Sequence, residues 1–140
     1  MSRILAVDYG KKRCGIAVTD PLKIIAGGLA TVATSELLSF IKDYTTREQV
    51  ETIVVGEPKQ PNGQPSENLP RVRAFVAQLK KMMPTMPVEY YDERFTSVLA
   101  HKAMIDGGLK KKARQNKALV DKISATIILE DFMQSRMLQR

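Results

Sequence analysis

Acidic residues occupy three places in the sequence where an ionised carboxylate is costly. Asp8 ends an apolar run, and Asp92 and Glu93 directly follow the run VEYY. Asp121 is in register with the apolar residues of a helical pattern that we expect to face a sheet. A carboxylate near a core is destabilising unless it is paired or binds a metal. One such acid indicates a local ion pair, whereas three positions on elements that meet in one fold indicate a shared site.

The chemistry that such a site supports is metal-dependent hydrolysis. Two divalent ions held ~3.5–4 Å apart by carboxylates can activate a water and stabilise the leaving oxygen of a phosphodiester. Oxygen ligands without a Cys/His cluster favour Mg2+ or Mn2+ over zinc. We expect the single histidine, His101, to be an ordinary surface residue and the single cysteine, Cys14, to be a partly buried strand residue. Nothing in the sequence supports a Ser/His/Asp arrangement.

The hydrophobic pattern predicts the elements that position these acids. Three strands come first, over residues 3–8, 14–18 and 24–32, the last with an irregularity at Gly27-Gly28. Helices and strands then alternate: a helix capped by Thr34 or Ser35, a strand over 52–56, a helix from Ser66 to about Met83, a strand over 88–91, a helix from Thr96 to Gly107, and a last helix from Asn116 to about Met137. The order βββαβαβα predicts an α/β protein with a mixed five-stranded sheet and helices on both faces, as in the ribonuclease H-like fold.

Composition and charge narrow the class of protein. At 140 residues and 44% hydrophobic composition, the chain is expected to fold as a single domain over residues 1–140. It has no signal-peptide pattern and no apolar run long enough to cross a bilayer, so we expect a cytoplasmic protein with no membrane partner. The net charge of +7 favours a polyanionic partner.

The positive charge is concentrated just before the helix that carries Asp121. This basic segment contains Lys110, Lys111, Lys112, Arg114 and Lys117, with no acid among them. An acidic site repels a phosphate backbone unless metals and nearby cations offset the field. We therefore expect the segment to contact a nucleic-acid substrate, the alternative being a solubilising loop.

Four motifs carry a resemblance that runs along nearly the whole chain. VDYGKKRCGIAVTD resembles the Asp-x-Gly-x-x-Arg-x-Gly opening hairpin of the YqgF family, and DERFTS resembles its Asp-Glu-Arg-[Leu/Phe]-Thr-[Thr/Ser] motif. VDKISATIILEDFM is similar to the closing helix of the family, and PKQPNGQPSE to its loop after the fourth strand. Each motif alone is weak evidence, but four in the right order and spacing are strong evidence. The resemblance implies a ribonuclease H-like nuclease that uses Mg2+ or Mn2+.

The resemblance also implies which acids are catalytic. Asp8, Glu93 and Asp121 would bind the metal, with Asp92 as a close rival to Glu93. One departure from the family pattern adds a further candidate: after the fourth strand the family usually has Gly-Leu-Pro, whereas this chain has Glu57 in place of the leucine. Other ribonuclease H-fold enzymes place a metal ligand at that strand end. Glu57 is therefore either a fourth acid of the site or a solvent-facing loop residue.

Arginine and glycine residues of the same motifs would support the site. Arg13 and Arg94 would bind phosphates or orient the carboxylates, since the guanidinium fork suits both tasks. Gly10 would provide a turn with positive φ, and Gly15 would permit a close approach of strands.

The substrate and the assembly stay open at this stage. The family is associated with maturation of the 5′ end of pre-16S rRNA and is similar to Holliday-junction resolvases, so we favour ribosomal RNA over branched DNA. A non-catalytic nucleic-acid-binding module is the rival from another class, and the presence of all three expected acids argues against it. A phosphotransferase of the actin/sugar-kinase type would need a second domain. A resolvase would need two sites on a two-fold dimer, and the sequence allows a monomer or a homodimer.

Overall fold

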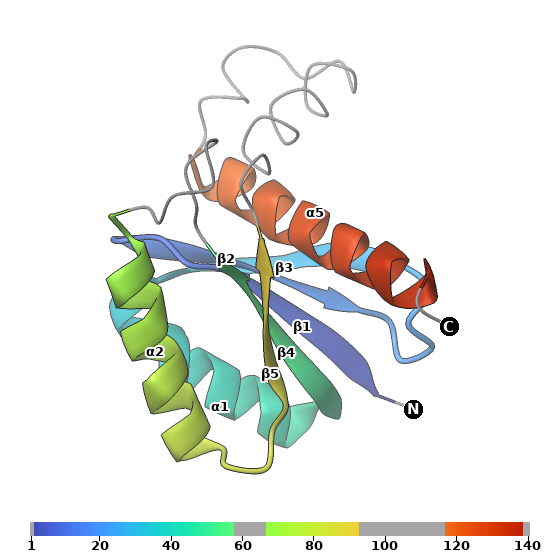
Figure 1. Cartoon of the computed structure of the whole chain (residues 1–140), viewed down its shortest axis with the longest axis horizontal. Coiled ribbons are helices and arrows are strands. Elements are labelled where there is room, and N and C mark those ends of the chain that lie inside the picture. The colour runs from blue at the N-terminus through green and yellow to red at the C-terminus, as the bar shows by residue number, and fades with distance from the viewer. Residues whose placement is uncertain (1, 58–66, 93–116, 139–140) are drawn as a thin grey trace.

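The computed structural model describes residues 2–57, 67–92 and 117–138 (Figure 1). Its elements are five strands, one short 3-10 turn and three α-helices within those ranges. In chain order they are β1 (Arg3–Asp8), β2 (Arg13–Thr19), β3 (Ala26–Ala33), η1 (Thr34–Glu36), α1 (Leu37–Arg47), β4 (Val50–Glu57), α2 (Leu69–Met82), β5 (Val88–Asp92) and α5 (Lys117–Leu138).

The strands form one mixed sheet in the order β3-β2-β1-β4-β5. β1, β2 and β3 are an antiparallel meander, whereas β4 is parallel to β1 and β5 is parallel to β4. The predicted mixed five-stranded α/β sheet is therefore confirmed. The helix predicted from Thr96 to Gly107 lies outside the described residues.

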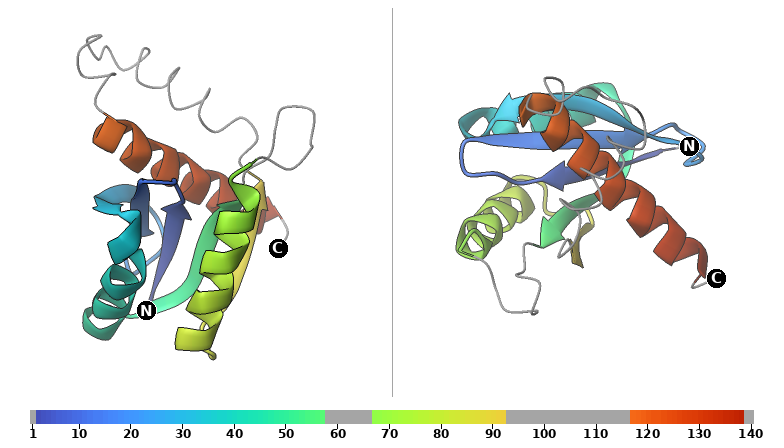
Figure 2. Two further views of the ribbon diagram at one scale, coloured as in Figure 1. Left: turned by 90° about the vertical axis from the view of Figure 1, so that its left-hand side faces the viewer. Right: turned by 90° about the horizontal axis from the view of Figure 1, so that it is seen from above.

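The two faces of the sheet are covered by different helices (Figures 1 and 2). Side chains alternate along β1, so that Leu5 and Val7 pack in one cluster with residues of α1 and α2. Ile4 and Ala6 pack in a second cluster with residues of α5. All four side chains are at most 3% exposed, as predicted for a central strand covered on both sides.

The residues that begin helix α1 differ from the prediction. Thr34 and Ser35 do not cap an α-helix, because they form the 3-10 turn η1, and no side-chain hydrogen bond caps α1. The Thr34 hydroxyl instead donates to the Gly10 carbonyl oxygen at 2.7 Å. This bond ties the end of β3 to the β1–β2 hairpin, so it serves tertiary packing rather than helix initiation.

Local irregularities elsewhere match the pattern of glycine and proline. The β2–β3 pairing shifts between Ile16 and Ala17, which pair with Ala30 and Gly28, so Leu29 has no partner in the register. The predicted irregularity beside Gly27-Gly28 is therefore confirmed. Pro70 lies in the first turn of α2, where its missing N–H costs nothing. No described helix is long and apolar enough to span a bilayer.

Candidate active site

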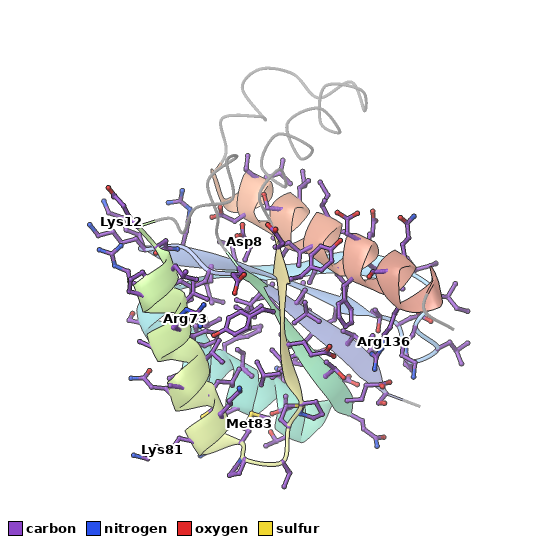
Figure 3. The ribbon with its side chains drawn as sticks, viewed as in Figure 1. Asp8, Lys12, Arg73, Lys81, Met83 and Arg136 are labelled. Carbon is purple, nitrogen blue, oxygen red and sulfur yellow. The ribbon has the colours of Figure 1, made fainter. Side chains whose placement is uncertain are left out.

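Three of the candidate acids are the last residues of neighbouring parallel strands. Asp8 ends β1, Glu57 ends β4 and Asp92 ends β5. Val7 pairs with Val55, and Glu57 pairs with Asp92. Because the carboxyl ends of parallel strands meet at one edge of a sheet, this edge collects the acids. Figure 3 shows Asp8 at this edge, with the end of α2 that carries Lys81 and Met83 at the opposite end of the molecule.

Asp121 reaches the same edge because α5 lies very close to β2. Gly15, which pairs with Asp8 across the β1–β2 ladder, is the point of contact. A Cβ added to Gly15 would lie 2.0 Å from the carbonyl oxygen of Asp121 and 3.1 Å from its Cβ. Only glycine allows this approach. Asp8 and Asp121 therefore lie on either side of Gly15.

Strand alternation places the Asp8 side chain on the face that α5 covers. Asp8 follows Ile4 and Ala6 at intervals of two, and both pack against α5. Both Asp8 and Asp121 also raise the pKa of the nearby Cys14 thiol, after the larger effect of burial. Two carboxylates from distant parts of the chain thus converge on one side of one strand end.

Arg13 holds Asp121 through a short ion pair. Its Nε donates to Oδ2 of Asp121 at 2.7 Å, with the side chains 37% and 22% exposed. Charge-assisted bonds of this length are stronger than neutral ones. The contact agrees with the expectation that Arg13 orients a carboxylate, and phosphate contact by Arg13 stays a prediction.

The two motif glycines act differently from expectation. Gly10 does not adopt the positive φ that we predicted; an added Cβ there would instead lie 2.3 Å from the Arg13 carbonyl oxygen. Gly15 permits the approach of a helix rather than of a strand. A third glycine, Gly28, lies under α5 as well, since an added Cβ would be 3.3 Å from Cβ of Lys122. The missed signal was the repetition of small residues on one face of β2 and β3.

Glu57 is on the other face of the sheet from Asp8. It alternates with Ile53 and Val55, which pack with α1 and α2. Its side chain is 18% exposed, and its Oε2 lies 3.8 Å from a terminal guanidinium nitrogen of Arg73 on α2. Glu57 is thus neither a loop residue nor on the side of Asp8 and Asp121. Sequence reasoning did not single out Arg73.

Asp92 shares the face of Val88 and Tyr90 rather than the face covered by α5. Both of those residues pack against the α1/α2 cluster, whereas Tyr91 packs against the α5 cluster. Tyr91 also meets Phe132 edge-on, with ring centroids 6.4 Å apart. These contacts agree with tyrosines used for packing.

The rest of the predicted site cannot be placed. Lys117 begins α5, but its side chain lies outside the described residues. The described residues contain no group of three or more His, Cys, Asp or Glu side chains arranged to hold a metal ion. The third acid therefore stays a prediction. Also outside the described residues are Glu93, Arg94, Lys110, Lys111, Lys112 and Arg114.

Comparison with known proteins identifies the family. The family model of RuvX, described as Holliday junction resolvase, matches residues 2–135. The chain belongs to the RuvX family. It is 65% identical over 136 residues to a protein of Phocaeicola vulgatus named "Putative pre-16S rRNA nuclease", covering 97% of this chain and 98% of that protein. A Bacteroides fragilis protein of the same name is 61% identical, covering 99% and 100%.

The RuvX family is the YqgF family that the motifs indicated, and it makes this chain a nuclease, a hydrolase of nucleic-acid ester bonds. Solved structures support the ribonuclease H-like fold. Thermus thermophilus RuvC in complex with a Holliday junction substrate matches with a TM-score of 0.60 at 18% identity, covering 98% of this chain and 96% of that one. A second Thermus thermophilus RuvC structure matches with a TM-score of 0.58 at 16% identity, covering 96% of each chain.

Proposed function

We propose that this RuvX protein is a metal-dependent endonuclease that hydrolyses phosphodiester bonds during maturation of the 5′ end of pre-16S rRNA in the cytoplasm. The observation that carries the proposal is the convergence of Asp8 and Asp121 around Gly15. Two carboxylates from elements far apart in sequence meet at one strand end, and Arg13 fixes one of them. A purely structural pair would not need two acids on the same side of the strand.

The donor set fits a hard divalent cation. Asp8 and Asp121 offer carboxylate oxygens, and Cys14, the nearby sulfur, is buried. Carboxylate oxygens favour Mg2+ or Mn2+. When bound, such an ion polarises the phosphoryl oxygens and lowers the pKa of water. Asp8 and Asp121 would hold it, and Arg13 would keep the Asp121 carboxylate in one orientation.

We assign the third acid to Glu93 rather than Asp92 or Glu57. Asp92 alternates with Val88 and Tyr90, and Glu57 alternates with Ile53 and Val55, so both belong to the face opposite Asp8. This placement weakens both as partners of Asp121. The motif match of Glu93 supports it, together with Arg94 and the basic segment from Lys110 to Lys117 as contacts for substrate.

Ribosomal RNA is the proposed substrate because close relatives carry the pre-16S rRNA nuclease name at 61–65% identity. The description of the family model favours the second candidate, a Holliday junction resolvase, which would act as a homodimer. Both substrates present phosphodiesters to the same carboxylates, so the assignment of Asp8 and Asp121 is common to both.

The test uses purified protein, Mn2+ and two labelled substrates, a pre-16S 5′-leader RNA and a four-way DNA junction. We expect cleavage of the RNA, and a loss of about 1,000-fold in Asp8→Asn and Asp121→Asn, because each removes an anionic ligand worth several kcal/mol. Circular dichroism should show both variants folded. Preferential cleavage of the junction would select the resolvase. Binding without cleavage would make the chain a non-catalytic module, and full activity in either variant would refute the site.

A further inference from the structure

We propose that Arg73, Arg71 and Lys12 form a second phosphate-binding surface, on the α2 side of the active edge, and that Glu57 positions Arg73 there instead of binding metal. The nucleic-acid backbone would cross the edge between this surface and Asp8. The inference rests on the proposed nuclease function and extends it to a binding site on the other face of the sheet.

Arg73 is held in place by two neighbours. Its guanidinium lies 3.8 Å from the Glu57 carboxylate and 5.8 Å from the centre of the Tyr90 ring. Both contacts also act on the Tyr90 phenol, whose pKa is raised by burial, lowered by Arg73 and raised by Glu57. A cation over an aromatic face is attracted to it and loses rotational freedom. Arg73 is thereby fixed beside the strand end.

The ion pair itself adds little to stability. The Arg73 side chain is 60% exposed, and the 3.8 Å separation is longer than a hydrogen bond. A guanidinium has five donors in a planar fork, suited to a phosphate. Fixed by a distant carboxylate and a ring, but open to solvent, Arg73 can present its fork to an anion. Glu57 therefore acts as a positioning residue.

Two other cations lie close to the active edge. Asn68, just before α2, donates from Nδ2 to the Tyr9 carbonyl oxygen at 2.9 Å, so the start of α2 abuts the residue after Asp8. Arg71 is exposed and lowers the pKa of the Tyr9 phenol, which burial raises. Lys12, also exposed, lies in the β1–β2 hairpin beside the start of α2 (Figure 3).

The charge of α2 has one sign. The helix carries four cations and no Asp or Glu: Arg71, Arg73, Lys80 and Lys81. The arginines are at the end near Asp8 and the lysines at the far end. Self-repulsion among like charges gives no folding benefit, whereas a phosphate backbone would be attracted by it. The two lysines provide a matched control of equal charge.

The experiment measures binding and cleavage separately. Binding of fluorescein-labelled pre-16S 5′-leader RNA is followed by anisotropy in EDTA at several salt concentrations. We expect Arg71→Ala/Arg73→Ala to bind at least about fivefold more weakly, with a shallower salt dependence by about 0.7 per lost phosphate contact. Lys80→Ala/Lys81→Ala should change binding much less, although it removes the same charge. An equal effect of the two pairs would overturn the inference.

Glu57→Gln distinguishes positioning from metal binding. With Mn2+ present, we expect KM to rise a few-fold and kcat to remain, because Arg73 loses its fixed orientation while Asp8 and Asp121 keep theirs. A loss of kcat like that of Asp8→Asn, with a higher Mn2+ requirement, would make Glu57 a metal ligand. Failure of the wild type to cleave any substrate would refute the nuclease function itself, whereas cleavage with unaltered RNA binding in the arginine variant would refute this surface alone.

Discussion

The two faces of the sheet are built from different kinds of residue. Large aliphatic side chains fill the face toward α1 and α2. Small residues line the face toward α5, where Ala6, Gly15, Ala17 and Gly28 meet Ala125 and Lys122 of the helix. Among the large side chains of the first face are Leu5, Val7, Ile16, Ile53 and Val55. One face keeps its helices at side-chain distance, and the other lets a helix backbone touch the strand.

The difference separates stability from function within single strands. In β2, Cys14 and Ile16 belong to the core under α1 and α2, whereas Arg13 and Gly15 face α5 and hold Asp121. Burial of large apolar groups is the dominant favourable term in folding. Substitutions on neighbouring residues of one strand should therefore differ in kind, and the predictions below test this in order of their effect on cleavage.

Gly15→Ala should have the largest effect. The added methyl group would lie 2.0 Å from the Asp121 carbonyl oxygen, so α5 must move away. A displacement near 1 Å at a catalytic group costs about 100-fold in rate, and we expect at least that loss in Mn2+-dependent cleavage. Gly27→Ala is the control, because no atom lies within 4 Å of its added Cβ. Equal activity of the two variants would mean that α5 does not depend on this contact.

Arg13→Gln should have the next largest effect. It removes the 2.7 Å bond to Asp121 and leaves that carboxylate less well oriented. Loss of a residue that orients a ligand costs about 10–100-fold, and we expect kcat to fall by about tenfold. Arg13→Lys should recover part of kcat, since it keeps the charge and loses the fork. Arg47→Gln, which breaks an exposed pair with Asp43 on α1, should leave kcat unchanged.

The sequence predicted the elements better than it predicted the side of the sheet on which the acids lie. Asp8 and Asp121 were identified because an acid interrupts an apolar pattern, and that signal is local. Glu57 and Asp92 interrupt such patterns too, but their face depends on the register Val7–Val55 and Glu57–Asp92, which only the folded sheet defines. Gly15 shows the same limit: a glycine in a strand indicates a close approach, but not which element approaches.

Leu5→Ala should alter stability and leave cleavage by the folded protein unchanged. Leu5 is fully buried in the cluster under α1 and α2, away from Asp121. Removing its side chain should cost about 2–5 kcal/mol of unfolding free energy, measured by urea denaturation. Ile16→Val, at about 0.5–1.5 kcal/mol, provides a milder variant if Leu5→Ala does not fold. A fall in kcat at full occupancy of the folded state would show that the two faces are coupled.

Cys14→Ala should have the smallest effect on cleavage but a distinct signature in alkaline stability. Burial raises the pKa of the Cys14 thiol above 9.0, its ordinary value. The folded protein then keeps a proton that the unfolded chain releases, so wild-type stability falls as the pH rises above about 9, by at most ~1.4 kcal/mol per pH unit. Urea denaturation between pH 8 and 10 should show this fall in the wild type and a shallower one in Cys14→Ala. Since Tyr9 and Tyr44, whose pKa values are also raised, titrate in both proteins, only the difference between the two curves reports the thiol. Parallel curves would mean that the thiolate is as well accommodated in the folded protein as in water, and that the α1/α2 face is less completely closed beneath the site than its packing indicates.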